Sequence, residues 1–149
     1  GIAALAFSLA AAKAHAGSCV FNEIVPVAFG PYNPFSGTPG SATGWVVYQC
    51  SLVNILDRVT IDLSVGSSGA YTPWRTLLSD VGNHPLQYNL YKDPGFTQIF
   101  GDGSGSTFHH GPQGLPVIPT KVFIYGYMPP SQNAWTGSYN DLIVVTMSF

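Results

Sequence analysis

The last thirteen residues of the chain, from Gly137 to Phe149, constrain the fold more than any other stretch. They are dense in β-branched and aromatic residues, and an Asn-Asp pair leads into a run that neither Gly nor Pro interrupts. Alternate residues of a strand share a face. One face here carries Tyr139, Ile143, Val145, Met147 and Phe149. The pattern therefore predicts a β-strand with a strongly apolar face.

This strand is followed by no further strand, and neither charge nor Pro blunts its edge. Proteins usually pair, cover or blunt such an edge, because its unpaired backbone groups are a template for association. Large side chains along the strand would each gain roughly 1.5–3 kcal/mol on burial. We therefore expect the strand to need a cover from elsewhere.

Composition points to an all-β extracellular domain. Only 8% of the residues are charged, against an average of about 25%, whereas 13% are aromatic and the 149 residues include 17 Gly and 12 Pro. That length suits a single domain. The five Lys and Arg residues are scattered singly and the net charge is −2, so nucleic acid is not an expected partner.

Short alternating runs recur along the chain, and turn formers separate them. No segment after the N-terminal Ala run has a convincing helical period, and seven or so short strands predict an antiparallel sandwich. Between the first two body strands, residues 29–44 are rich in Gly, Pro and Ser and predict a long ordered loop. The expected body strands cover residues 19–27, 45–50, 59–65, 76–78, 85–91, 96–100, 120–127 and the terminal stretch.

The chain has two cysteines, Cys19 and Cys50, and neither lies in a CxxC motif or beside a histidine. An even count in an exported type of chain favours one disulfide. Two buried free thiols are the alternative.

The sequence offers no catalytic constellation. The Gly101–Gly105 run lacks the lysine of a phosphate loop, and a tight turn explains Asp102 and its serine neighbours better than a calcium site does. His109 and His110 lack further ligands nearby, and no Gly-x-Ser-x-Gly motif occurs. We expect neither a metal, a cofactor nor an enzymatic activity, and an extracellular hydrolase is the least favoured interpretation.

Residues 1–18 allow two interpretations. The Ala/Leu content and the Ala-His-Ala ending resemble a signal peptide, in which case the mature chain begins at Gly17. Alternatively the segment is a retained arm, because Leu5, Phe7, Leu9 and Ala11 recur at every second position and share a face as a strand. Lys13 interrupts the stretch, which is also too short to span a membrane stably.

Six short motifs, taken in order, resemble the spore coat protein U family, which includes subunits of archaic chaperone–usher pili. The resemblance covers residues 19–149, and Phe100 stands where the family more commonly has Trp. The motifs are Phe29-Gly-x-Tyr-Asn-Pro, Gly44-x-Val-x-x-x-Cys50, Tyr88-x-Leu-Tyr-x-Asp93, Phe100-Gly-Asp-Gly103, Tyr125-Gly126 and Gly137-x-Tyr-x-Asp141.

The resemblance implies an incomplete immunoglobulin-like antiparallel β-sandwich that lacks its final strand, with a donor strand from another subunit completing it. Residues 1–18 would then be the donor arm, although arms in this family are usually rich in Thr and Val, and residues 19–149 would be the sandwich domain. The expected donor residues are Leu5, Phe7, Leu9 and Ala11, and the expected acceptor groove is lined by Ile143, Val145, Met147 and Phe149.

The same resemblance implies a secreted structural subunit of an extracellular pilus that serves adhesion or biofilm formation. Its implied partners are identical or homologous subunits, a periplasmic chaperone and an outer-membrane usher. The alternative is a tip adhesin or stand-alone coat protein that accepts a strand but has residues 1–16 removed as a signal peptide.

Overall fold

The computed structural model describes residues 2–11, 17–82 and 84–149. Within these ranges the chain forms ten strands and one short 3₁₀-helix, η1 (Gly66–Ser68). This confirms the all-β class. The strands are β1 (Ile2–Ala11), β2 (Ser18–Val25), β3 (Ala28–Pro31), β4 (Gly40–Ser51), β5 (Arg58–Leu63), β6 (Arg75–Ser79), β7 (Leu86–Tyr91), β8 (His110–Gly114), β9 (Thr120–Met128) and β10 (Ser138–Ser148).

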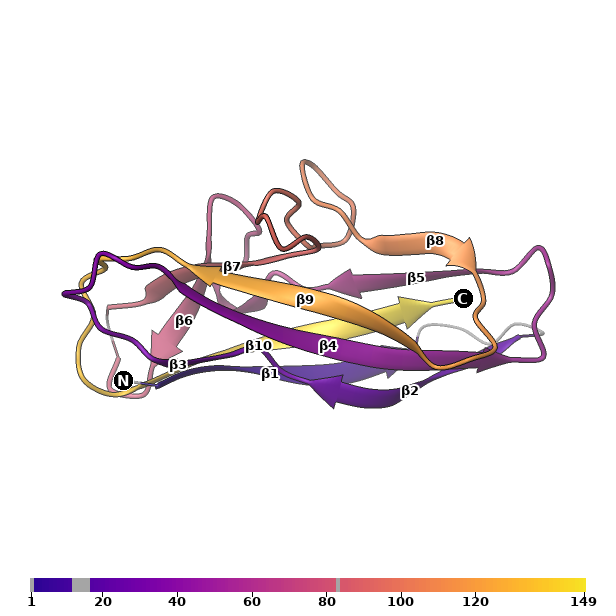
Figure 1. Ribbon diagram of the computed structural model, residues 1–149, viewed down its shortest axis with the longest axis horizontal. Helices are drawn as coiled ribbons and strands as arrows, with labels where there is room; N and C mark the ends of the chain where they lie inside the picture. Colours follow the sequence, from indigo (N-terminus) through magenta and orange to yellow (C-terminus); the bar gives the residue numbers. More distant parts are fainter. Residues whose placement is uncertain (1, 12–16, 83) are drawn as a thin grey trace.

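The strands form one continuous sheet that curls into two layers (Figure 1). The order is β2-β4-β9-β7-β6-β10-β1-β3, and β5 joins β10 on one side and β8 on the other. In Figure 1 the layer with β4 and β9 crosses in front of the layer with β10 and β1. Strands β7 and β6 pair with each other and connect the two layers.

The core lies between the layers and follows the period of two. In β4, Val46, Tyr48 and Cys50 are buried while their neighbours are half-buried or exposed. In β10, Ile143 and Val145 are likewise fully buried. Inward-facing residues of both layers therefore meet in one core, as expected for a sandwich.

A disulfide joins Cys19 of β2 to Cys50 of β4, which confirms the expected bridge. The two residues are direct partners in the antiparallel β2–β4 ladder. The bond therefore ties the first strand of the body to its neighbour in the sheet, β4.

The prediction of a loop over residues 29–44 is wrong at both of its ends. Ala28–Pro31 forms β3, and β4 already begins at Gly40, where its first residues pair with β9. Gly44 is needed here because a Cβ atom at this position would lie 2.5 Å from the carbonyl oxygen of Val25. Glycine at this position of the strand lets two backbone segments approach closely. Judged by composition alone, the same glycine indicates a loop.

Two further strand predictions need correction. Residues 96–100 form no strand, and Ile99 and Phe100 make only isolated bridges, because the Asp93 carboxylate accepts hydrogen bonds from the backbone N–H groups of Thr97 and Gln98 and holds a turn. Strand β8 was not predicted, because its five residues include two Gly and one Pro. Finally, the sheet is not purely antiparallel, since β1 and β10 run parallel.

Within the described ranges, no helix has the length and apolarity that a membrane crossing requires.

Candidate functional site

The strand β10 lies inside the sheet and is paired along both edges. On one edge it pairs with β5 and β6, and on the other it pairs with β1 over ten consecutive residues. On its other edge, β1 pairs antiparallel with β3 through its first residues. We call the position between β10 and β3 the acceptor site, and in this structure residues 2–11 of the same chain fill it.

The register places the expected donor residues directly beside the expected groove residues. Phe7 is the partner of Ile143, Leu9 of Val145 and Ala11 of Met147. Paired residues of neighbouring strands point to the same face, so Phe7 lies on the core side of the sheet together with Ile143.

Burial along β1 supports this arrangement for the side chains that the structure describes. Leu5 is 2% exposed, and Ala3, which the sequence analysis did not single out, is 1% exposed. Phe7 is partly buried and packs against the core cluster. The side chains of Leu9 and Ala11 lie outside the described set.

On the groove side, the three residues Ile143, Val145 and Met147 are completely buried. Phe149 is partly buried and packs against the same cluster. The four expected groove residues therefore all contribute to the core, and β1 pairs with β10 alongside Ile143, Val145 and Met147. Supply of that strand by another copy stays a prediction, because a single chain is present.

A buried carboxylate, Asp141, shares the apolar face of β10 and was missed as a functional residue. It is 3% exposed and is the register partner of Leu5. One carboxylate oxygen accepts hydrogen bonds from the backbone N–H (2.7 Å) and the hydroxyl (2.6 Å) of Ser67, and the other accepts from the Tyr88 hydroxyl. Its main hydrogen-bond partners are distant in sequence, so no local pattern indicates this role.

Around that carboxylate the structure buries a second charged group, Arg75, which is fully inaccessible. Its guanidinium donates to the carbonyl oxygens of Ser64 (2.8 and 3.1 Å) and Phe100 (2.7 Å) and to Oδ1 of Asn89 (2.7 Å). Burial lowers the pKa of Arg75 from its ordinary value. These contacts join β6, β7 and the segments that flank them. The motif residues Tyr88 and Asp141 were the only sequence signal for this polar core.

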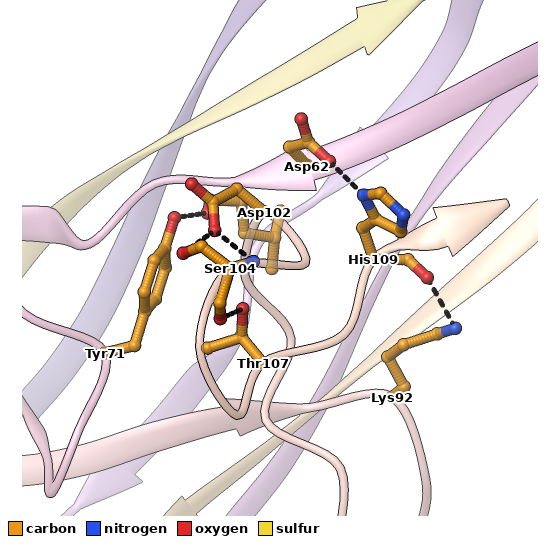
Figure 2. A network of polar contacts seen from close by, with 8 residues as sticks. Asp62, Tyr71, Lys92, Asp102, Ser104, Thr107 and His109 are labelled. Carbon is orange, nitrogen blue, oxygen red and sulfur yellow. Dashed lines mark hydrogen bonds and ion pairs between the residues drawn. The ribbon is translucent and has the colours of Figure 1, made fainter. Parts of the chain in front are cut away.

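The loop after β7 carries a second polar cluster, shown in Figure 2. Nδ1 of His109 lies 3.0 Å from the Asp62 carboxylate, and the Lys92 ammonium donates to the His109 carbonyl oxygen. Asp102 accepts hydrogen bonds from the backbone N–H (2.9 Å) and the hydroxyl of Ser104, which makes the expected tight turn. These hydrogen bonds lower the pKa of Asp102.

Asp62 differs from Asp102 because burial is the largest influence on it and raises its pKa, while the hydrogen bond to His109 acts in the opposite direction. Within the described part of the chain, no group of three or more His, Cys, Asp and Glu residues is placed to hold a metal ion. The cluster instead stabilises the loop against β5.

A cavity of about 680 Å³ opens at the end of the sandwich where β1 and β10 begin. Ala3 of β1 and Tyr139 of β10 line it, together with residues of the loops that follow β3 and β9. The hydroxyl of Tyr139 is held by the backbone of Trp135, since it accepts from the Trp135 N–H and donates to the Trp135 carbonyl oxygen, both at 2.8 Å. The cavity wall is therefore complete only when a strand occupies the acceptor site.

Comparison with known proteins agrees with this architecture. The chain is similar to Protein U of Myxococcus xanthus, with 33% identity over 131 residues that cover 81% of this chain and 70% of that protein. Its structure is similar to a chain in the crystal structure of the CsuC–CsuE chaperone–tip adhesion subunit pre-assembly complex from the archaic chaperone–usher Csu pili of Acinetobacter baumannii.

That structural match has a TM-score of 0.54 and 17% sequence identity, and it covers 89% of this chain but only 40% of the other. At this identity the likeness concerns the fold, and it confirms the immunoglobulin-like sandwich expected from the sequence. The model of the Spore Coat Protein U domain matches residues 5–146, which is most of the chain. The chain therefore belongs to the spore coat protein U family.

Proposed function

We propose that this chain is a structural subunit of an extracellular fibre, in which the arm of one copy fills the acceptor site of the next. The observation that carries the proposal is the ten-residue ladder between β1 and β10, in which apolar residues of the arm cover apolar residues of the last strand. Because β1 belongs to the N-terminal arm and ends before the body begins at β2, an identical arm of a neighbour has the side chains to replace it.

Family membership and the pilus origin of the structural neighbour support this proposal. By the same analogy, the subunit passes through the periplasm, where a chaperone covers the acceptor site before an outer-membrane usher assembles the fibre. The fibre would then serve adhesion or biofilm formation at the cell surface.

The experiment compares two arm variants in a fibre-assembly assay read by electron microscopy. Leu5→Asp with Phe7→Asp puts two charges on the buried face of the arm, and one of them lies beside Asp141. The matched control, Ala6→Asp with Ser8→Asp, puts the same charges on the outer face, where Ala6 is exposed and Ser8 half-buried. The first variant is expected to form no fibres and the control to form them.

Fibres of normal length from the Leu5→Asp, Phe7→Asp variant would contradict the proposal. Intact-mass measurement of the exported protein separates it from the alternative of a strand-accepting tip or coat protein. A mature chain that begins at Gly17 has no arm to donate.

A further inference from the structure

We propose that the two ends of the sandwich are complementary contact surfaces, such that an apolar loop of one copy fits the aromatic cavity of the next. The loop comprises residues 52–56, between β4 and β5, and is called the tip loop. The cavity at the opposite end is called the end cavity and is lined by Tyr32, Phe35, Leu86, Ala134, Trp135 and Tyr139 among others. The inference rests on the proposed function, because it concerns how copies meet within the fibre.

The tip loop presents four large aliphatic side chains to solvent, of which Val53 is 40% exposed and the other three are more exposed. Leu52 is 80% exposed, Ile55 88% and Leu56 82%. Single exposed apolar residues are ordinary, but a contiguous apolar group on a low-charge protein marks an interaction surface.

Hydrogen bonds hold the tip loop in a defined conformation. Oδ1 of Asn54 accepts from the Leu56 N–H (3.0 Å), the Asn54 carbonyl oxygen accepts from the Asp57 N–H (3.0 Å), and Arg58 donates to the Ile55 carbonyl oxygen (2.9 Å). Leu52 has a φ of 53°, a left-handed conformation that costs a leucine backbone energy. The loop is thus ordered around its exposed side chains.

A second loop enlarges the apolar surface next to the tip loop. Val117 and Ile118 are 57% and 68% exposed. Two hydrogen bonds hold their loop against β4. The Cys50 N–H donates to the Pro116 carbonyl oxygen (2.8 Å), and the Gln49 side-chain amide donates to the Val117 carbonyl oxygen (2.8 Å). Six exposed aliphatic side chains among the described residues therefore lie at this end.

The end cavity lies at the other end of the molecule (Figure 1), beside the first residues of β1 and β10. The ten residues of β1 separate the two ends by about 30 Å. Phe35 is 95% exposed and Trp135 is 57% exposed, and the Trp135 ring stacks on His84 with centroids 4.1 Å apart. None of the described residues that line the cavity is charged, so aliphatic side chains can enter without desolvating an ion among them.

The position of the arm determines which ends meet. The body starts beside the tip loop, because a Cβ atom on Gly17 would lie 3.5 Å from the Leu52 carbonyl oxygen. The end that carries the tip loop therefore faces whichever copy receives the arm.

Two ways of donating the arm then differ in symmetry. If the donated arm kept the parallel direction that β1 has in its own chain, like ends would meet and two copies would close into a pair. If the arm ran antiparallel to the neighbour's β10, the tip loop would meet the end cavity of that neighbour. Only the second arrangement repeats without closing, as a fibre requires.

The contact is therefore heterologous and joins a convex apolar loop to a concave aromatic site on the next copy. In the self-filled chain Ala3 of the arm lines the cavity, so a strand in the acceptor site contributes to the cavity wall. A donated strand and a tip loop from the same neighbour would complete the site in one event.

The first test compares fibre elongation rates of full-length Leu56→Asp and Phe108→Asp, measured by light scattering on folded protein. Phe108 is 46% exposed in the loop between β7 and β8, and Figure 1 shows this loop projecting from the middle of the molecule, so this residue is the control. Burial of one leucine side chain corresponds to on the order of a tenfold change in an equilibrium or rate constant. We expect Leu56→Asp to elongate about tenfold more slowly or worse, and Phe108→Asp to elongate at the normal rate.

Equal rates for Leu56→Asp and the control would overturn the inference. They would leave the proposed function standing as long as Leu5→Asp with Phe7→Asp still abolishes fibres. Normal fibres from that arm variant would instead contradict the proposed function itself.

The second test maps the contact by cross-linking and does not depend on fibre yield. The chain has no free cysteine among its described residues, so single cysteines can be introduced at Ile55 and Phe35. In fibres grown from a mixture of Ile55→Cys and Phe35→Cys chains, we expect a mixed disulfide dimer upon mild oxidation. Dimers of Ile55→Cys with itself, or no mixed dimer in well-formed fibres, would overturn the inference.

Discussion

At the residue scale, Asp141 shows how a charged group can stabilise a strand that is otherwise apolar. Its carboxylate is buried on the core face of β10 and accepts three long-range hydrogen bonds, from the Ser67 N–H, the Ser67 hydroxyl and the Tyr88 hydroxyl. Burial is the larger cause and the neighbouring Asp141 carboxylate the second, and together they raise the pKa of Tyr88 well above its ordinary value. Tyr88 therefore keeps its proton and donates its hydrogen bond to Asp141 at neutral pH.

We predict that Asp141→Asn lowers the free energy of unfolding by about 2–3 kcal/mol, because the amide loses the charge and cannot accept every bond. Urea denaturation followed by tryptophan fluorescence measures the effect. Glu23→Gln makes the same chemical change on an exposed residue of β2 and should stay within about 0.5 kcal/mol of wild type. Equal stabilities for the two variants would show that the carboxylate is not needed.

His110 gives the stability a defined dependence on pH. Its Nε2 lies 2.9 Å from the Tyr48 hydroxyl, and burial, aided by nearby Lys92 and His109, lowers its pKa below the ordinary 6.5. The folded state thus binds the proton more weakly than the unfolded state does. The resulting stability is present above about pH 6.5 and is lost as the pH falls through the lowered pKa.

We predict that the wild type loses more unfolding free energy than His110→Gln between about pH 8 and about pH 5. Parallel urea titrations at each pH provide the comparison. Since the other titrating groups are common to both proteins, parallel curves would exclude His110 as the cause.

At the element scale, the disulfide between β2 and β4 is the simplest feature to test. It closes a loop with a sequence separation of 31, for which the chain-entropy model gives about 3–4 kcal/mol. We predict a loss of that size for Cys19→Ser with Cys50→Ser. Thiol labelling of denatured, unreduced wild type should give no signal, whereas two labelled cysteines would refute the bridge.

The strand elements also show what sequence patterns can predict. Alternation predicted the strand β10 and its core face, and it agrees with the burial of Leu5 and the partial burial of Phe7 in β1, because a period of two fixes which side chains share a face. The period fixes neither the direction in which a strand runs nor the strand with which it pairs. The parallel β1–β10 pairing, and its formation within one chain, therefore could not be predicted.

The early start of β4 and the burial of Arg75 were not predicted, because both depend on contacts with segments that are distant in the sequence. Gly44 lies in a strand because the backbone of Val25 approaches it closely, although the surrounding Gly and Ser indicate a loop. Arg75 is buried inside β6 because carbonyl oxygens from distant segments surround it. Contacts of this kind depend on tertiary structure and leave no local pattern.

At the scale of the whole molecule, the arm occupies the acceptor site of its own body, which leaves the apolar face of β10 covered. For fibre growth the same arm must leave that site and enter another. The self-filled chain is then a competitor of the fibre, so the balance between the two forms depends on protein concentration.

The central claim is that an arm of one copy fills the acceptor site of another, and cross-strand cysteine pairing tests it most directly. One chain carries Ser8→Cys in the arm, and a second, isotopically labelled chain carries a single cysteine at Leu142, Val144 or Thr146, which lie on the outer face of β10. Neither chain can form the cross-link alone. A third chain with cysteines at both Ser8 and Val144, which are register partners, reports filling of the site by its own arm.

In fibres grown from the mixture, strand exchange predicts a disulfide between labelled and unlabelled chains at one of the three positions, detected by mass spectrometry. Fibres without any such mixed cross-link, in which only the chain with both cysteines forms its internal bond, would contradict the account.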